Sequence, residues 1–118
     1  MTTGPELRNR TEAFAVRIVK LYKSLPYTGD AQVLGKQLLR CSTSVAANYR
    51  AACRGRSRAE WIAKIGLVVE EADESVFWLE MLIDCDIVPQ ARLADLLREG
   101  HELNEMFTAS QGTAKRKK

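Results

Sequence analysis

The chain has few of the residues that build disulfide frameworks, metal centres and β-rich folds. Its 118 residues include three cysteines, one histidine, three prolines and seven glycines. The cysteines (Cys41, Cys53 and Cys85) are odd in number, far apart and without a Cys-x-x-Cys pair. This spacing argues against a disulfide framework and a zinc site, and it fits a reducing cytoplasm. So few prolines and glycines leave little room for a β architecture with many turns.

Long apolar runs are also missing. No stretch approaches the roughly 18 apolar residues that span a bilayer, and the N-terminus does not resemble a signal peptide. The sequence therefore predicts a cytoplasmic protein without membrane contact. With 46% hydrophobic and 28% charged residues, the chain forms one domain that buries a core without metal or disulfide support. We expect no cofactor.

Charges of opposite sign are segregated along the chain. Residues 1–56 contain ten Lys or Arg and three Asp or Glu, whereas residues 57–110 contain four and twelve. The last eight residues add four positive charges, and the net charge is +3. A basic half followed by an acidic half indicates elements that pair within one fold and leave a positive strip for a polyanion.

Apolar residues recur at helical spacing in four segments. A capping box at 9–12 predicts the start of the first helix, and Pro26 ends it. Asp30 is the expected N-cap of the second helix. The middle of that helix, residues 42–48, consists almost entirely of small side chains, which is typical of a tight helix-packing face.

The third and fourth helices have equally clear signals at their ends. Gly55 is expected to end the second helix in a left-handed conformation, and a second capping box at 57–60 opens the third. The third helix is expected to continue to Asp86, and Pro89 fits the first turn of the fourth.

Four amphipathic helices with short links predict an all-α fold, an antiparallel up-down four-helix bundle. We expect the bundle domain over residues 1–112 and a disordered basic tail over residues 113–118.

The turn between the second and third helices sets their register, because residues equidistant from a tight turn face each other. Arg40 is then expected level with Glu71 and close to Glu70, and Lys36 near Glu74. The register thus predicts ion pairs between a basic second helix and an acidic third helix.

Four carboxylates between residues 70 and 74 raise the hypothesis of a metal site. Di-metal sites in helical bundles need Glu-x-x-His repeats on two helices. The chain has a single histidine, His101, and the residue three positions before it is Arg98. No nucleophile–base pair is visible either. We therefore expect no metal and no enzymatic activity, and we keep a metal-dependent hydrolase only as a third hypothesis.

Basic residues cluster around the turn after the second helix and at the C-terminus. Arginine suits phosphate because its planar fork donates two parallel hydrogen bonds. Tyr49 and Trp61 lie nearby, either as stacking surfaces or as core residues. The pattern is the electrostatic footprint of a nucleic-acid binder without a base-reading motif, and the alternative is a solvated turn with a solubilising tail. The candidate nucleic-acid-binding residues are Arg50, Arg54, Arg56, Arg58, Lys64, Lys115, Arg116, Lys117 and Lys118.

The second and third helices carry a pattern that is also found in a known family. Leu38-Leu39-Arg40, then Ser44-Val45-Ala46-Ala47-Asn48, a basic turn, Trp61 and Glu74 follow one another in this order. The chain resembles the four-helix bundle proteins encoded in large-subunit ribosomal RNA intervening sequences, over roughly residues 14–107. Many members follow the asparagine with Ile-Ala-Glu-Gly, whereas this chain has Tyr49-Arg50-Ala51-Ala52. The difference places it in a more basic branch.

The resemblance implies a cyclic homopentamer, and the family is not known for catalysis. A related protein, the accessory variability protein of diversity-generating retroelements, binds nucleic acid and a reverse transcriptase. The implied partners are therefore RNA or DNA, further copies of the chain, and a protein such as a reverse transcriptase. Arg40, Asn48 and Glu74 carry over as structural groups in a polar network between helices, to which the register adds Glu70 and Glu71.

Two hypotheses of different classes follow. The leading one is a non-enzymatic, oligomeric bundle that binds nucleic acid through a basic surface as an adaptor for a partner protein. The rival is a protein-interaction scaffold that does not bind nucleic acid.

Overall fold

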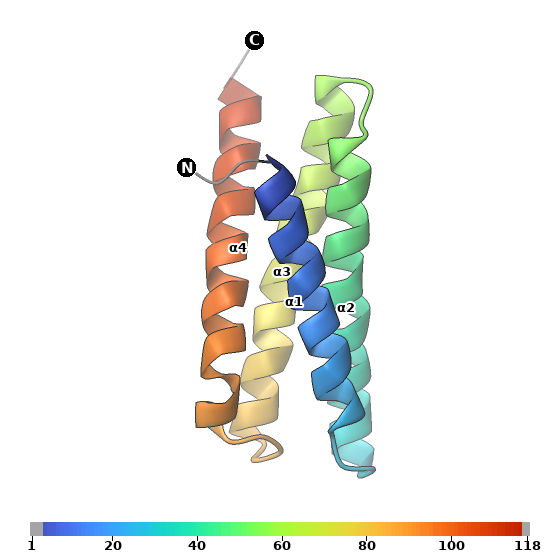
Figure 1. Ribbon diagram of the computed structural model, residues 1–118, viewed down its shortest axis with the longest axis vertical. Coiled ribbons are helices and arrows are strands. Elements are labelled where there is room, and N and C mark those ends of the chain that lie inside the picture. The colour runs from blue at the N-terminus through green and yellow to red at the C-terminus, as the bar shows by residue number, and fades with distance from the viewer. Residues whose placement is uncertain (1–3, 117–118) are drawn as a thin grey trace.

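The computed structural model describes residues 4–116. It consists of four helices, α1 (Gly4–Lys23), α2 (Gly29–Cys53), α3 (Arg58–Asp84) and α4 (Gln90–Arg116), without a strand in the described range. They lie side by side along the long axis of a molecule of 49 × 23 × 20 Å, and consecutive helices run in opposite directions (Figure 1). The all-α prediction with four helices is confirmed.

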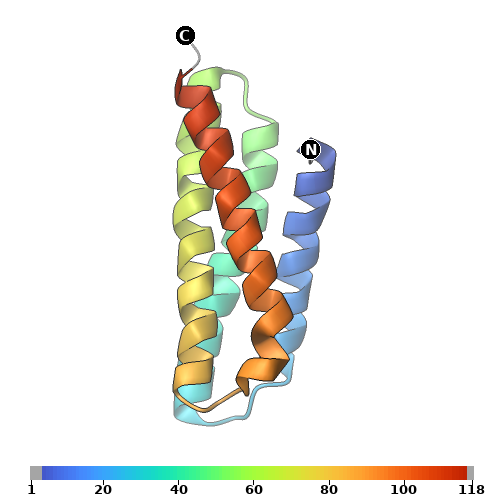
Figure 2. The same ribbon diagram turned by 90° about the vertical axis from the view of Figure 1, so that its left-hand side faces the viewer.

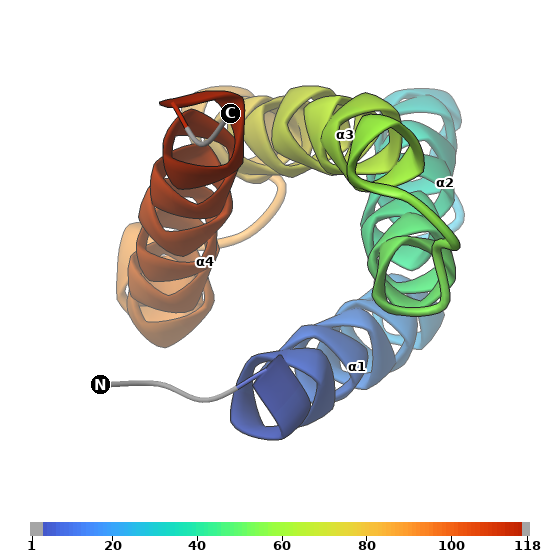
Figure 3. The same ribbon diagram turned by 90° about the horizontal axis from the view of Figure 1, so that it is seen from above.

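The helices surround the core in chain order (Figure 3). α2 packs most closely against α3, whereas α1 and α4 make the fewest contacts of any adjacent pair. The N-terminal end of α1, the α2–α3 turn and the C-terminal end of α4 lie at one end of the bundle, and the other two loops lie at the opposite end (Figures 1 and 2). We call the seam between the first and last helices the α1–α4 seam.

The core consists of the predicted apolar stripes. Burying each large aliphatic side chain contributes about 1.5–3 kcal/mol. Sequence periodicity missed Leu82 and Val88, which are almost completely buried where the α3–α4 loop folds back, and Leu7 near the N-terminus. The largest fully buried apolar side chains are Phe107, Ile18, Leu38, Ile65, Leu79, Leu82, Leu93, Leu103, Val45, Val68 and Val88.

The first helix begins at Gly4, so the predicted start at the 9–12 capping box is wrong. Leu7 is 6% exposed and Thr11 is 1% exposed, which extends the buried stripe of α1 by two turns towards the N-terminus. The Thr11 hydroxyl donates to the Leu7 carbonyl at 2.7 Å and so does not cap a helix. Burial of Leu7 therefore outweighs the local capping signal at Asn9.

The start of α2 differs by one residue from the prediction. Thr28, and not Asp30, occupies the N-cap position, and the helix begins at Gly29. The Asp30 carboxylate instead accepts from the Ala31 amide at 2.8 Å. Hydrogen bonds from Thr28 and then Ala31 lower the pKa of Asp30, so this carboxylate stays charged at the positive end of the helix dipole.

The α2–α3 turn confirms one predicted cap and overturns another. Gly55 is not left-handed, because no glycine among the described residues has a positive φ. α2 ends instead in two tight turns, in which the Arg54 and Gly55 amides donate to carbonyls three residues back at 3.1 and 3.0 Å. The Ser57 hydroxyl accepts from the Glu60 amide at 3.1 Å, as a capping box requires. The Glu60 carboxylate accepts from the Arg56 amide at 2.6 Å, one residue before the expected donor.

The left-handed residue lies at the other end of α3. The helix ends at Asp84, not at Asp86, and Asp86 has a φ of 58°. The Ile87 amide donates to the Leu82 carbonyl at 3.0 Å, and the Asp86 amide donates to the Ile83 carbonyl at 3.0 Å. These two bonds form a Schellman motif with an aspartate where glycine is usual.

The fourth helix continues beyond the predicted domain boundary at residue 112. It begins at Gln90, directly after Pro89, and runs to Arg116, so residues 113–116 are helical where the sequence predicted disorder. Two basic residues in the last turn, Lys115 and Arg116, interact favourably with the negative end of the helix dipole. Lys117 and Lys118 lie outside the described residues.

Candidate nucleic-acid interface

The α2–α3 turn presents four arginines to solvent, which we call the basic turn. Arg50 lies in the last turn of α2, Arg54 and Arg56 lie in the connection, and Arg58 begins α3. All four are exposed. The Ser57 cap fixes the entry into α3, so the guanidinium groups are carried by a well-defined turn.

The structure adds basic residues from both ends of the chain to this turn. The end of α4 lies alongside the start of α3, because a Cβ at Gly66 would come within 3.2 Å of the Gln111 Nε2 atom. Lys115 and Arg116 therefore lie at the same end of the bundle as the basic turn (Figure 1). The exposed Lys64 follows nearly two turns into α3.

Arg8 is a further basic residue that sequence reasoning missed. It is exposed on the first turns of α1. Its positive charge acts to lower the pKa of Tyr49 of α2, so the two residues lie near each other. The sequence analysis placed Arg8 outside the first helix, although the spacing from Leu7 to Phe14 was a signal of a longer helix. We call the basic turn together with Arg8, Lys64, Lys115 and Arg116 the basic end.

The two aromatic residues near the basic turn belong to the core. Tyr49 is 3% exposed, and its ring centroid lies 6.1 Å from that of Trp61 and 5.2 Å from that of Phe107. Burial raises the pKa of the Tyr49 hydroxyl, Cys53 adds to the rise, and the charge of Arg8 opposes it. Trp61 is half-buried against the same cluster. Tyr49 is thus not exposed for base stacking, and the basic end offers mainly charge.

The predicted ion pairs between α2 and α3 form around Arg40. Its guanidinium lies 3.2 Å from the Glu71 carboxylate and 2.5 Å from the Glu74 carboxylate, which also accepts from the Trp78 indole at 3.1 Å. The register prediction for Arg40 is confirmed. Exposed pairs of this kind contribute about 0.2–1 kcal/mol each.

Three other members of the predicted network lie apart from it. Glu70 is exposed and forms no ion pair within residues 4–116. Within residues 4–116, Lys36 forms no ion pair with Glu74, whose carboxylate pairs with Arg40. The Asn48 amide donates within its own helix, to the Ser44 carbonyl at 3.0 Å and hydroxyl at 2.9 Å. The network is therefore the Arg40 cluster between α2 and α3, and Asn48 stabilises α2 locally.

Comparisons with known proteins agree with this architecture. The family model of the 23S rRNA-intervening sequence protein matches residues 6–109. The chain therefore belongs to this family. A solved structure at 1.70 Å, of a protein with unknown function from the S23 ribosomal protein family of Bacteroides thetaiotaomicron VPI-5482, is also similar. It is 33% identical, covers 92% of this chain and 97% of its own, and superposes with a TM-score of 0.86. No curated protein matches.

Small buried residues lie between α2 and α3, the two helices that share the most contacts. Ser42 and Ser75 are buried, and the Ser42 hydroxyl donates to that of Ser75 at 3.0 Å. The Ser75 hydroxyl donates in turn to the Glu71 carbonyl at 2.9 Å. The predicted packing face of α2 is confirmed, because only short side chains allow two helices to approach and bond in this way.

The carboxylates and His101 are the groups of this family member that could take part in catalysis or metal binding. Within residues 4–116, no group of three or more His, Cys, Asp or Glu side chains is arranged to hold a metal ion. His101 is exposed on α4, away from the Arg40 cluster and from the basic turn. In the same range, none of the helices is both apolar and long enough to traverse a membrane.

Proposed function

We propose that this intervening sequence protein binds RNA or DNA non-enzymatically, through phosphate contacts at its basic end. One observation carries the proposal. Three segments far apart in the sequence, the start of α1, the α2–α3 turn with the start of α3, and the end of α4, supply exposed cations to the same end of the bundle.

The chemistry of the basic end favours backbone contacts. Its arginines offer guanidinium forks that match phosphate, and Tyr49 is buried and cannot stack on a base. Phosphate contacts position a nucleic acid without reading its sequence. We therefore expect affinity that depends strongly on salt and weakly on sequence.

Assembly would multiply the effect of the basic end. The family resemblance implies a cyclic homopentamer, in which symmetry repeats every basic end around one axis. A ring of basic ends would contact an extended polyanion at several points and gain avidity. In the cytoplasm, such a ring would serve as an adaptor that brings nucleic acid to a partner protein, with a reverse transcriptase as one example from the resemblance.

The proposal is tested by measuring binding of a structured RNA and a single-stranded DNA across a salt series. For about four phosphate contacts, affinity falls roughly a hundredfold between 50 and 200 mM salt. Replacing the four arginines of the basic turn by alanine should abolish most of the binding, and Lys115→Gln with Arg116→Gln should weaken it further.

The control is a variant with the same change in net charge towards the opposite end of the bundle, Lys23→Glu with Lys36→Glu, at exposed residues that do not line the α1–α4 groove. Equal loss of binding in both variants would indicate a net-charge effect and contradict a localised interface. Absence of binding in the unaltered protein would favour the scaffold hypothesis.

The scaffold hypothesis is supported by a separate feature of α3. Its solvent face carries the acidic residues Glu70, Asp73, Glu80 and Asp84, and Phe77, which is 49% exposed, lies between Asp73 and Glu80 on the same face. An apolar side chain bordered by charges is typical of a protein contact surface. This acidic face is a candidate for contacts between copies of the chain.

A further inference from the structure

The α1–α4 seam is closed at one point and open at another. Near the basic end, the Arg10 guanidinium donates to Glu99 at 3.0 and 2.5 Å and to Glu102 at 3.2 Å, which ties α1 to α4. These carboxylates raise the pKa of Arg10 and keep it charged. Towards the α1–α2 loop there is no such cluster, and the two helices enclose a groove of about 330 Å³.

The groove has an apolar floor and a basic rim. Leu21, Leu93 and Leu96 are buried residues that line it, and the polar residues of its walls are Arg17, Lys20, Ser24, Arg92 and Asp95. The groove is formed by α1 and α4 only, and no residue of the basic end lines it. It is therefore a feature separate from the proposed nucleic-acid interface.

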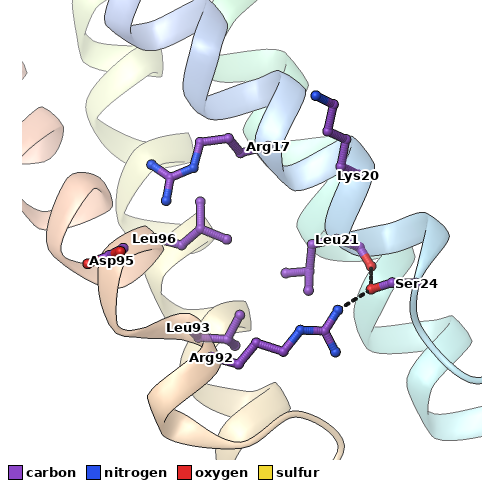
Figure 4. A pocket seen from close by; sticks show the side chains of 8 residues that line it. All are labelled: Arg17, Lys20, Leu21, Ser24, Arg92, Leu93, Asp95 and Leu96. Atoms are coloured by element: carbon purple, nitrogen blue, oxygen red, sulfur yellow. Dashed lines mark hydrogen bonds between the residues drawn. The ribbon is translucent and has the colours of Figure 1, made fainter.

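Two arginines cross the seam from opposite walls. Arg92 extends from α4 to α1, where its Nη2 atom donates to the Ser24 hydroxyl at 2.6 Å (Figure 4). Ser24 is itself fixed, because its hydroxyl donates to the Leu21 carbonyl at 2.7 Å. Arg17 extends from α1 towards Leu96 of α4, and Lys20 lies at the rim (Figure 4).

The positive charges of the groove exceed its negative charge. Within residues 4–116, Arg17 and Lys20 form no hydrogen bond or ion pair, and Arg92 bonds only to the neutral Ser24 hydroxyl. The one acidic residue of the lining, Asp95, accepts from Arg98 at 3.1 Å and points away from the Arg92–Ser24 bond (Figure 4). Arg17, Lys20 and Arg92 thus outnumber Asp95, the one carboxylate of the lining, which pairs with Arg98.

We propose that the α1–α4 groove binds a small phosphate ester or a nucleic-acid end, whose phosphate group is attracted by Arg17 and Arg92 from opposite walls of the groove. Each guanidinium offers paired donors to phosphate oxygens, and Ser24 keeps Arg92 in place across the seam without neutralising it. Lys20 adds charge at the rim. The leucine floor accommodates the carbon atoms next to the phosphate.

The experiment is a titration of the full chain with inorganic phosphate and with pyrophosphate, followed by amide chemical shifts and calorimetry. Shifts should concentrate at residues 17–24 and 92–96. Arg17→Gln and Arg92→Gln should each weaken binding about tenfold, the usual loss for one charged hydrogen-bonding partner. Lys36→Gln on α2 removes a positive charge outside the groove and should leave the affinity unchanged.

Two short single-stranded DNAs, with and without a 5′-phosphate, separate the two sources of phosphate. A preference for the phosphorylated strand that disappears in Arg17→Gln and Arg92→Gln identifies a nucleic-acid end, and equal binding of both strands identifies a free phosphate ester. Both variants keep the basic turn, so their RNA binding at the basic end serves as the check that they are folded. The proposal is overturned if phosphate and pyrophosphate leave the groove shifts unchanged, or if the two arginine variants bind them as the unaltered chain does.

Discussion

Asp86 is the one non-glycine residue with a positive φ among residues 4–116. A side chain in this conformation is strained by contact between its Cβ and the backbone, and aspartate tolerates it better than most residues. The position is the C′ residue of the Schellman motif that ends α3. The strain is offset by the buried loop that follows, since Val88 is 2% exposed.

Asp86→Gly should therefore stabilise the protein. We expect the free energy of unfolding in urea to rise by about 0.5–1 kcal/mol, because glycine adopts this conformation without strain. Asp84→Gly is the matched control, since it removes the same charge from the last residue of the helix and should cost up to about 1 kcal/mol. A loss of stability in Asp86→Gly would contradict the interpretation of strain.

Cys41 differs from the other two cysteines in its burial. It is fully buried, whereas Cys53 and Cys85 are exposed. Burial raises the pKa of the Cys41 thiol, and a hydrogen bond with Ser75 opposes the rise. The thiol is therefore protonated and shielded in the folded protein, while an unfolded chain ionises it at ordinary pH for cysteine.

This difference predicts both reactivity and pH dependence. A thiol reagent should label Cys53 and Cys85 in the folded protein and Cys41 only on unfolding. The pKa of Cys41 is higher in the folded than in the unfolded state. Its contribution to the free energy of unfolding is therefore complete below the unfolded-state pKa. It is lost as the pH rises above that value, by at most about 1.4 kcal/mol per pH unit. Cys41→Ala should flatten the fall in stability above about pH 9; an unchanged slope would contradict the prediction.

At the level of the helices, two glycines differ in how closely the neighbouring helix approaches them. A Cβ at Gly35 of α2 would lie 2.6 Å from the Leu25 Cδ1 atom and 3.1 Å from the Tyr22 ring. A Cβ at Gly66 of α3 would meet only the end of the Gln111 side chain, at 3.2 Å. α1 and α2 thus approach closely at Gly35, whereas Gly66 is a helix position without a packing constraint.

The two glycines should respond in opposite directions to alanine. Gly35→Ala should lower the free energy of unfolding by about 1 kcal/mol, because overpacking exceeds the gain in helix propensity. Gly66→Ala should raise it by up to about 1 kcal/mol, because Gln111 can move aside. Thermal unfolding of both variants at one protein concentration measures the difference, and a stabilised Gly35→Ala would show that Leu25 repacks at little cost.

The ends of the helices show where sequence signals fail. Ser57 is a correct cap because its hydroxyl and Glu60 act within one turn, a purely local geometry. The capping box at 9–12 is equally good locally, but Leu7 gains burial only when α1 extends past it. A local signal thus predicts a helix end correctly only where no buried side chain lies beyond it.

At the scale of the whole molecule, charge segregation acts in two ways. Within the chain it aligns Arg40 of α2 with the carboxylates of α3. Beyond those pairs it leaves a basic end and an exposed acidic face on α3, in one molecule. Opposite surfaces that remain unpaired within a single copy are suited to attract another copy or a charged partner.

The assembly prediction concerns this acidic face. If it contacts basic residues of a neighbouring copy, Glu70→Lys with Glu80→Lys should reduce the oligomer mass in sedimentation, and added salt should reduce the mass of the unaltered protein. Glu105→Lys, an exposed charge reversal on α4, is the control for a general effect of charge. An unchanged mass in the double variant would place the subunit contacts elsewhere.

The sequence by itself determined the four helices, the buried stripes and the Arg40 register, because helical periodicity and a tight turn relate residues that are near in the chain. It also identified the basic turn, whose residues lie within nine positions of one another. Only the tertiary structure decided that Arg8, Lys115 and Arg116 join this turn, and that Arg17 and Arg92 line one groove along the α1–α4 seam. These groupings depend on how α1 packs against α2 and how α4 packs against α3, at opposite ends of the chain, and no local pattern encodes that arrangement.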